Sequence, residues 1–446
     1  MRQIVLMLVL GVCCTSGWAK EGDGWYTEGN FVPEQRIRLT VTNTLAVDRA
    51  ACHVVVKRED LPVNNIPQRY ITVVDPALQG NPEPSEEDLR KFSGYLIRKE
   101  EYGHYLEYQM DDIDKDGIWD ELFFMIDLGA RETRTIYLYI GQAERGLYIH
   151  QTHAGIGYYG RHIVPFWESE YLGWKLWFPT SIDMHGKITP MLTAYPEYQR
   201  NLSGYYMPPE YGSDIMTVST TFGAGGIGVS EVPADPDSVT RPMYNFRNGE
   251  GPYESPRFSY DVVVNGPLRS MIRARTMNWN SGSGFYEYEL LLTSYAGKSY
   301  STCQVAFTTF HPLEPKTMFV CGMREIMNEY DSEMVGGAAI SFGKDIEVRT
   351  PDEDIDDEGM FVTFEGIAIA VKDEYRPEYR NIKRQGGNHI FRLPVTDDKS
   401  FEFMIMGGWS KGPVNRTADE FRTNVQSEVL GYKNPSVVKV YEYEAK

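Results

Sequence analysis

Short runs of β-branched and aromatic residues, separated by turn-forming residues, dominate this chain. Clear examples are residues 36–41, 53–56, 135–140, 260–264 and 286–292. Runs of this length and composition favour strands, and the Gly, Pro, Asn and Asp residues between them favour turns. Their spacing is irregular, which disfavours propellers and solenoids. The sequence therefore predicts an all-β protein with few helices.

One segment near the C-terminus has a helical pattern instead. Thr417 and Glu420 have the spacing of a capping box, in which each residue satisfies a free backbone N–H of the first turn. Phe421, Val425 and Val429 follow on one helical face. We expect a helix here that packs on the β-rich body.

The strand pattern also suggests a division of the chain. It gives way to Gly-, His- and Tyr-rich sequence between about residues 142 and 160. Residues 20–148 are predicted to form an N-terminal β-sandwich, and residues 149–446 a larger β-domain.

The first nineteen residues resemble a secretory leader. Arg2 precedes the apolar run 4–10, and small residues near Ala19 offer a cleavage site. We therefore expect export to the periplasm or the cell exterior. A lipid-anchored terminus at Cys13 or Cys14 is a weaker alternative. The leader is too short for a stable membrane span, and no other apolar run approaches that length.

The charge balance limits the class of partner. The chain has 44 Lys and Arg against 63 Asp and Glu, a net charge of −19. Nucleic-acid binding needs a basic surface, so this composition argues against it. An acidic substrate would have to meet a few well-placed cations in a local pocket.

Three cysteines follow the leader: Cys52, Cys303 and Cys321. Export would permit a disulfide between Cys303 and Cys321, on either side of a predicted turn. Two buried thiols are the alternative, because disulfide geometry is strict.

An acidic stretch between two predicted strands is a candidate Ca²⁺ site. Its carboxylates are Asp112, Asp114, Asp116, Asp120 and Glu121, and a glycine lies among them. Oxygen ligands at alternating positions suit a hard cation. The chain has phenylalanine where an EF-hand has its bidentate glutamate, so a solvated acidic hairpin tip is the alternative.

Aromatic residues concentrate at residues 165–178. Read as one continuous strand, this segment has Trp167, Lys175 and Trp177 on one face. Exposed indole rings with a cation between them suit a sugar and its carboxylate or hydroxyl groups. The alternative is an amphipathic strand that is buried on both sides.

Residues able to bind anions or move protons lie on both sides of this segment. Arg161 could pair with a carboxylate, and Lys187 could add a second cation. His162, Asp183 and His185 are candidate proton-transfer groups, although a single histidine is more often structural.

A further set of candidates lies nearer the C-terminus. Residues 408–412 match the GxSxG pattern of a nucleophile elbow, but the helix begins only at Thr417 and no histidine follows His389. We reject a serine hydrolase on these grounds. Trp409 and Lys411 are predicted to contact substrate, with simple packing as the alternative, and His389 is a weaker candidate on a loop.

Four segments taken together carry a resemblance to a known family: residues 112–122, 167–170, 183–187 and 408–411 with the helix that follows. In these segments the chain resembles the bacterial domain of unknown function 4861 family, found in exported proteins of polysaccharide-degrading bacteria. The likeness spans about residues 36–435. It implies carbohydrate metabolism and a galactose-mutarotase-like β-supersandwich in the larger domain. It implies no catalytic set.

The leading functional hypothesis is an exported carbohydrate-active enzyme that cleaves a uronic-acid-containing oligo- or polysaccharide by β-elimination. Arg161 and Lys187 would neutralise the uronate, His162 or a tyrosine would abstract the C5 proton, and a proton donor would assist departure of the O4 leaving group. One alternative is a glycoside hydrolase that uses Glu168 and Asp183 as paired carboxylates. Another is a non-catalytic glycan-binding protein of the cell envelope.

Overall fold

The computed structural model describes residues 24–26, 33–63, 65–67, 70–78, 104–141, 149–159, 162–177, 180–194, 211–218, 220–242, 256–345 and 362–445. The predicted leader and Arg161 lie outside these ranges, and so does the side chain of His162. No helix within the described ranges is long and apolar enough to cross a membrane.

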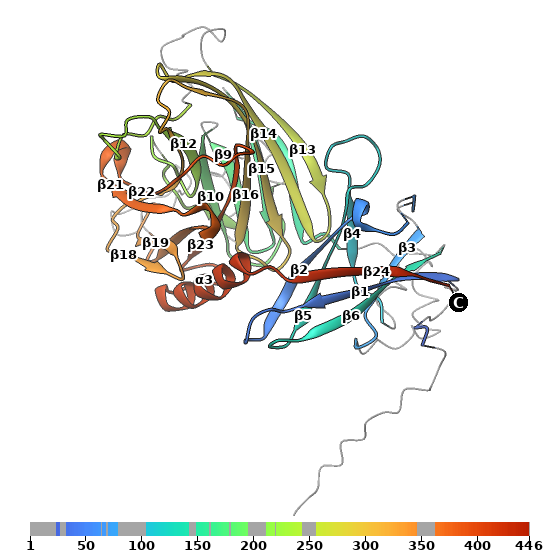
Figure 1. The fold of residues 1–446 in the computed structure, drawn as a ribbon. Helices are drawn as coiled ribbons and strands as arrows, with labels where there is room; N and C mark the ends of the chain where they lie inside the picture. The colour runs from blue at the N-terminus through green and yellow to red at the C-terminus, as the bar shows by residue number, and fades with distance from the viewer. Residues whose placement is uncertain are drawn as a thin grey trace, which may run out of the picture.

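A β-sandwich forms the smaller body of the molecule (Figure 1). One sheet has the order β24-β1-β6-β3, with β1 (Gln35–Thr42), β3 (Ile71–Val74), β6 (Thr133–Ile140) and β24 (Val437–Ala445). The other has the order β2-β5-β4, with β2 (Arg49–Lys57), β4 (Tyr108–Asp111) and β5 (Glu121–Leu128). Apolar residues of both sheets meet between them, including Ile37, Leu39, Val54, Phe124 and Leu138. A 3-10 turn, η1 (Arg58–Asp60), follows β2.

The last strand returns to this N-terminal sandwich. β24 pairs with β1 in antiparallel register, from Gln35 with Ala445 to Thr42 with Val437. In Figure 1 the red β24 leaves α3 and runs beside the blue β1. The C-terminal strand thus lies apart from the larger β-body, to which the sequence analysis assigned all residues after 148.

The larger body contains three antiparallel sheets. The eight-stranded sheet contains, in spatial order, β13 (Arg257–Asn265), β14 (Arg269–Asn280), β15 (Gly284–Tyr295), β16 (Tyr300–Pro312), β23 (Ser400–Trp409), β20 (Glu365–Val371), β19 (Ala338–Gly343) and β18 (Asp331–Val335). The five-stranded sheet contains β11 (Gly212–Asp214), β10 (Ser181–Lys187), β9 (Leu172–Trp177), β8 (His162–Ser169) and β7 (Thr152–Tyr159). The four-stranded sheet contains β12 (Gly226–Ser230), β17 (Met318–Arg324), β22 (Asn388–Leu393) and β21 (Glu378–Ile382). Two 3-10 turns, η5 (Asp373–Tyr375) and η6 (Arg384–Gly386), complete it.

One hydrophobic core joins these three sheets. It includes Trp174 of β9, Ile182 of β10, Phe319 of β17, Tyr286 of β15 and Trp409 of β23. Burial of such rings supplies most of the driving force for packing sheet on sheet. The all-β prediction, with few helices, a small N-terminal sandwich and a larger body of several antiparallel sheets, is confirmed.

The predicted helix is α3 (Ala418–Lys433), the one α-helix of the described residues. The hydroxyl of Thr417 accepts a hydrogen bond from the Glu420 backbone N–H at 3.2 Å, which confirms the cap. Phe421, Val425 and Val429 are fully buried against the eight-stranded sheet, so the predicted face is also confirmed.

Polar and aromatic contacts join the two bodies. Arg269, at the start of β14, donates hydrogen bonds to Asp111 at 2.6 Å and Glu121 at 2.7 Å. Its guanidinium also lies over the Phe123 ring. His53 of β2 stacks on Tyr295 at 4.2 Å between ring centroids, and burial lowers its pKa well below the usual range. The imidazole is therefore neutral in this interface.

All three described cysteines are buried free thiols. Cys303 lies on β16 in the eight-stranded sheet and Cys321 on β17 in the four-stranded sheet. The structure therefore has the two buried thiols that were one of the two alternatives.

Candidate functional site

The five-stranded sheet has one apolar and one charged face. A turn around residues 170–171 divides the aromatic segment into β8 and β9, which pair Trp167 with Trp174 and Phe166 with Lys175. Paired residues share a face, so Trp167 and Lys175 lie on opposite faces. The predicted common face is therefore wrong, because the reversal at the turn was not recognised. Trp167 is fully buried in the core, where its indole N–H donates to Ser301 at 2.8 Å.

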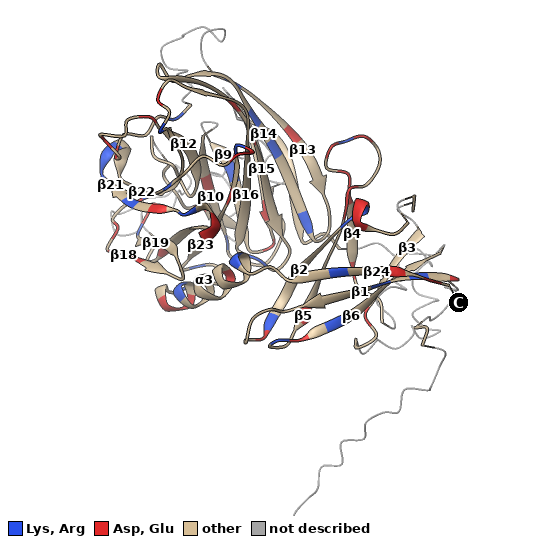
Figure 2. Cartoon of the chain, viewed as in Figure 1, with Lys and Arg blue, Asp and Glu red and all other residues tan. Residues whose placement is uncertain are grey.

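The charged face collects several of the predicted residues. Strand pairing determines which side chains lie on the charged face. Asp183 pairs with Lys175, His185 pairs with Asp214, and Glu168 pairs with Gly173. Its polar members are His153, Glu168, Lys175, Asp183, His185, Lys187 and Asp214. Figure 2 shows that Asp and Glu intersperse with Lys and Arg over both bodies.

Glu168 and Lys187 form a closed ion pair on this face. The Lys187 ammonium contacts the Glu168 carboxylate and donates to the Met191 carbonyl at 2.8 Å. The same carboxylate accepts backbone hydrogen bonds from Thr193 and Ala194, each at 3.0 Å. Burial favours the neutral acid, but Lys187 and these donors outweigh it and lower the pKa of Glu168 to about 2. Glu168 is therefore a carboxylate throughout the neutral range.

Lys175 bridges two carboxyl groups. Its ammonium lies 2.6 Å from Asp214 and 3.2 Å from Asp183. Burial and the nearby Asp214 charge raise the pKa of Asp183 to about 8, although Lys175 opposes the shift. At neutral pH Asp183 therefore keeps a proton that an ordinary aspartate would have released.

His185 lies on β10 between Asp183 and Lys187 in sequence, with its side chain buried. Burial, together with the charges of Lys175 and Lys187, lowers its pKa to about 3. The imidazole is therefore neutral at physiological pH, and in this neutral form it can accept a proton.

Glu365 adds a further acid that the sequence analysis missed. It begins β20 and is fully buried, and within the described structure neither of its carboxylate oxygens has a hydrogen-bond partner. Burial and the charges of Asp345, Asp183 and Asp214 raise its pKa well above the usual range. The sequence did contain a signal for this residue: Glu365 is the one charged residue of the otherwise apolar run that ends at Val371, which indicates a buried acid. Asp214 had no comparable signal, because its short strand has no clear pattern.

The remaining predicted contacts divide between core and surface. Trp409 is buried, and its indole N–H donates to the Lys187 carbonyl at 3.2 Å. His389 lies inside β22 and is fully buried, so the predicted loop placement is wrong. Lys411 is exposed beyond β23, and Trp177 is half-buried with its ring 5.2 Å from the Lys175 ammonium. Of the three predicted sugar-contacting tryptophans, Trp177 alone keeps an accessible ring.

The acidic loop joins β4 to β5 as predicted, and its carboxylates organise the turn. Asp112 accepts hydrogen bonds from the backbone of Asp116 at 3.2 Å and Gly117 at 2.9 Å. Asp120 accepts one from Ile113 at 2.7 Å. Oxygens of Asp112, Asp114 and Asp116 lie within 4.8 Å of one another, whereas Glu121 points to Arg269. Calcium binding by this loop stays a prediction, with Glu121 outside the cluster.

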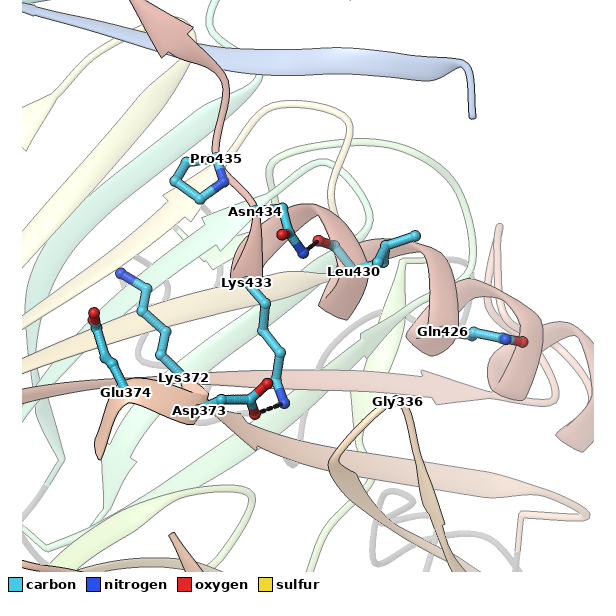
Figure 3. Close-up of a pocket in the computed structure, with 9 residues that line it drawn as sticks. All are labelled: Gly336, Lys372, Asp373, Glu374, Gln426, Leu430, Lys433, Asn434 and Pro435. Carbon is cyan, nitrogen blue, oxygen red and sulfur yellow. Dashed lines mark hydrogen bonds and ion pairs between the residues drawn. The ribbon is translucent and has the colours of Figure 1, made fainter. Parts of the chain in front are cut away.

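A separate cavity of about 500 Å³ lies beside the C-terminal end of α3 (Figure 3). Lys433 of α3 pairs with Asp373 of η5 at 2.5 Å across it. Its lining residues are Gly336, Lys372, Asp373, Glu374, Gln426, Leu430, Lys433, Asn434 and Pro435. None of these is a residue that the sequence analysis selected.

Two solved structures are similar in fold, at low sequence identity. A protein in the glycosyl hydrolase family 38 from Enterococcus faecalis has a TM-score of 0.44 and 9% identity, covering 92% of this chain and 48% of the other. An alpha-mannosidase from Enterococcus faecalis V583 has a TM-score of 0.43 and 10% identity, covering 93% and 47%. The chain spans about half the length of both structures.

No curated protein matches the chain in sequence. One family matches over most of its length, from residue 41 to residue 438. This range includes the acidic loop, the charged face and α3. The chain belongs to the family described as Domain of unknown function (DUF4861).

Proposed function

We propose that the charged face is the active site of an exported carbohydrate-active enzyme that hydrolyses a glycosidic bond in an oligo- or polysaccharide. The observation that carries this proposal is the Lys175 bridge. Because the ammonium lies 3.2 Å from Asp183 Oδ2 and 2.6 Å from Asp214 Oδ2, these oxygens are less than about 6 Å apart. This upper limit includes the separation of about 5–5.5 Å of retaining glycosidases and lies below the range of about 6.5–9.5 Å of inverting ones.

The two carboxyl groups are suited to different roles. Asp183 keeps its proton at neutral pH and would donate it to the departing glycosidic oxygen. Asp214, held 2.6 Å from the Lys175 ammonium, would attack the anomeric carbon as a carboxylate. The Glu168–Asp183 pair considered in the sequence analysis is less suitable, because Lys187 and two backbone N–H groups already engage Glu168.

The substrate class rests on two further points. Trp177 offers a half-buried ring beside Lys175, where the apolar face of a sugar could stack. The family resemblance implies carbohydrate metabolism in exported proteins. Neither point selects a particular glycan.

The test uses purified protein and a panel of plant, algal and host glycans, with release of reducing ends, in the absence of unsaturated uronides, as the measure of hydrolysis. Asp183→Asn removes the proposed acid and is expected to lower kcat by roughly 10²–10⁴-fold. Glu374→Gln, at an exposed glutamate of η5, is the matched control and should retain full activity. Unchanged turnover in a folded Asp183→Asn variant would refute the assignment, and binding without turnover in the native protein would favour a glycan-binding role.

A second candidate is the predicted β-elimination on a uronic-acid glycan. The neutral imidazole of His185 lies on the same strand face as the protonated Asp183. His185 could therefore act as the base of the elimination and Asp183 as the acid. One observation opposes elimination: Lys187, the cation expected to neutralise the uronate, already forms an ion pair with Glu168. His185→Gln separates the two reactions. It should abolish formation of unsaturated uronides if elimination operates, and should preserve release of reducing ends if hydrolysis does.

A further inference from the structure

Three potential metal ligands meet at the edge of the four-stranded sheet, apart from the charged face. Glu325 directly follows β17, Glu329 precedes β18, and His389 is the second residue of β22. Each offers one ligand atom, and these atoms all lie within 4.8 Å of one another. The sequence analysis did not bring them together, because two of the elements are more than fifty residues apart.

The histidine of this cluster is held as a metal-binding histidine usually is. Its side chain is fully buried, and its Nδ1 lies 2.8 Å from the hydroxyl of Tyr379. A second partner on Nδ1 fixes the ring and leaves Nε2 directed at the carboxylates.

The carboxylates remain reachable from solvent. The Glu325 and Glu329 side chains are 17% and 16% exposed, whereas His389 is 0% exposed. The cluster therefore has a closed side at the imidazole and an open side at the carboxylates, through which an ion could reach it.

The backbone supports the position of Glu325. Its N–H donates to the Gly387 carbonyl at 3.0 Å. Gly387 has a φ of +86°, and a Cβ at that position would lie 2.3 Å from a carboxylate oxygen of Glu325. Glycine is thus required here both for the backbone conformation and for the approach of the carboxylate.

We propose that Glu325, Glu329 and His389 bind one divalent transition-metal cation of the Zn²⁺ class. His389 Nε2 and Glu329 Oε2 are 2.8 Å apart, and ligand atoms around a tetrahedral zinc with bonds of about 2.1 Å are roughly 3.4 Å apart. A shift of a few tenths of an ångström on each side would therefore admit the ion.

Binding would replace two interactions of the cluster. The one ring proton of the neutral imidazole would lie on Nδ1, which would donate it to the Tyr379 oxygen, and the lone pair of Nε2 would be left to bind the ion in place of its contact with Glu329. Lys383, now paired with Glu325, would turn into solvent. The Lys383 side chain is 73% exposed, so loss of its ion pair costs little.

The ligand types select the class of cation. An imidazole with two carboxylates suits zinc and its transition-metal neighbours, whereas calcium prefers a larger set of oxygens. The acidic loop offers oxygens alone, so the two clusters should differ in preference.

The experiment is calorimetric titration of the full chain with ZnCl₂, and in parallel with CaCl₂. We expect one zinc ion per chain. Glu329→Gln or Glu325→Gln should each weaken zinc binding by more than tenfold, and Tyr379→Phe, which loses the support of Nδ1, by about tenfold. The paired variant Asp112→Asn with Asp114→Asn is the control, and should leave zinc binding unchanged.

Three results would overturn the proposal: no zinc binding by the native chain, zinc affinity in the glutamine variants equal to that of the native chain, or loss of zinc binding in the acidic-loop control. Circular dichroism of each variant checks its fold. Tyr379→Phe is the most conservative change, so it keeps the test decisive if a glutamine variant fails to fold.

Discussion

Two buried lysine–carboxylate clusters lie on one face of one sheet, yet they hold their protons in opposite ways. In the first, Lys187 meets the single carboxylate of Glu168, and the pKa of Glu168 falls to about 2. In the second, Lys175 meets Asp183 and Asp214, and the pKa of Asp183 rises to about 8.

Burial does not explain the difference, because Glu168 and Asp183 are 0% and 3% exposed. What differs is the number of donors for each negative charge. Glu168 has a lysine and two backbone N–H groups to itself, whereas two aspartates divide one lysine. A single cation cannot compensate two buried carboxylates, so one of them keeps a proton. The first cluster is thereby a structural ion pair, and the second holds a proton that the proposed hydrolysis would use.

The largest test of this comparison removes each lysine in turn. Lys187→Met leaves the Glu168 carboxylate buried without its cation, and should lower the free energy of unfolding by about 3–5 kcal/mol. Lys175→Met should cost less near pH 6, because the aspartates can take up protons instead. Urea unfolding of both variants measures the difference. Equal losses at this pH would show that the two clusters do not differ in proton storage.

Sequence patterns were sufficient for the fold wherever the signal was local. Alternating apolar residues identified strands such as β1 and β6, and the Thr417–Glu420 spacing identified the start of α3. The acidic loop was placed correctly between two strands for the same reason.

The candidate site was only partly predictable, because it depends on which face each strand presents. One unrecognised turn at residues 170–171 moved Trp167 from the predicted sugar face into the core. Asp183, His185 and Lys187 were identified from their residue types on a single strand. Glu365 was missed, because the burial of an acid is decided by neighbours distant in sequence.

The next largest effect concerns stability in acid. The pKa of Glu168 is about 2 in the folded protein and 4.5 ordinarily, so its contribution is present above about pH 4.5 and lost as pH falls toward 2. This loss should amount to about 3 kcal/mol. Urea unfolding from pH 5 downward should show a shallower decline in the double variant Glu168→Gln with Lys187→Met. An unchanged slope would place the acid sensitivity elsewhere.

The smallest effect has the opposite sign and concerns the change in stability near neutral pH. The pKa of Asp183 is about 8 in the folded protein and 3.8 ordinarily. The stability that its protonation contributes to the folded state is therefore complete below about pH 3.8 and is lost as pH rises toward 8. Between roughly pH 6 and 7.5 the native protein holds one proton that the unfolded chain has released, which should lower the free energy of unfolding by about 2 kcal/mol. Asp183→Asn cannot release that proton, so its stability should change less over this interval, while Glu374→Gln should follow the native protein. If Asp183→Asn also follows it, Lys175 alone must be compensating both aspartates, and the contrast between the two lysine clusters disappears.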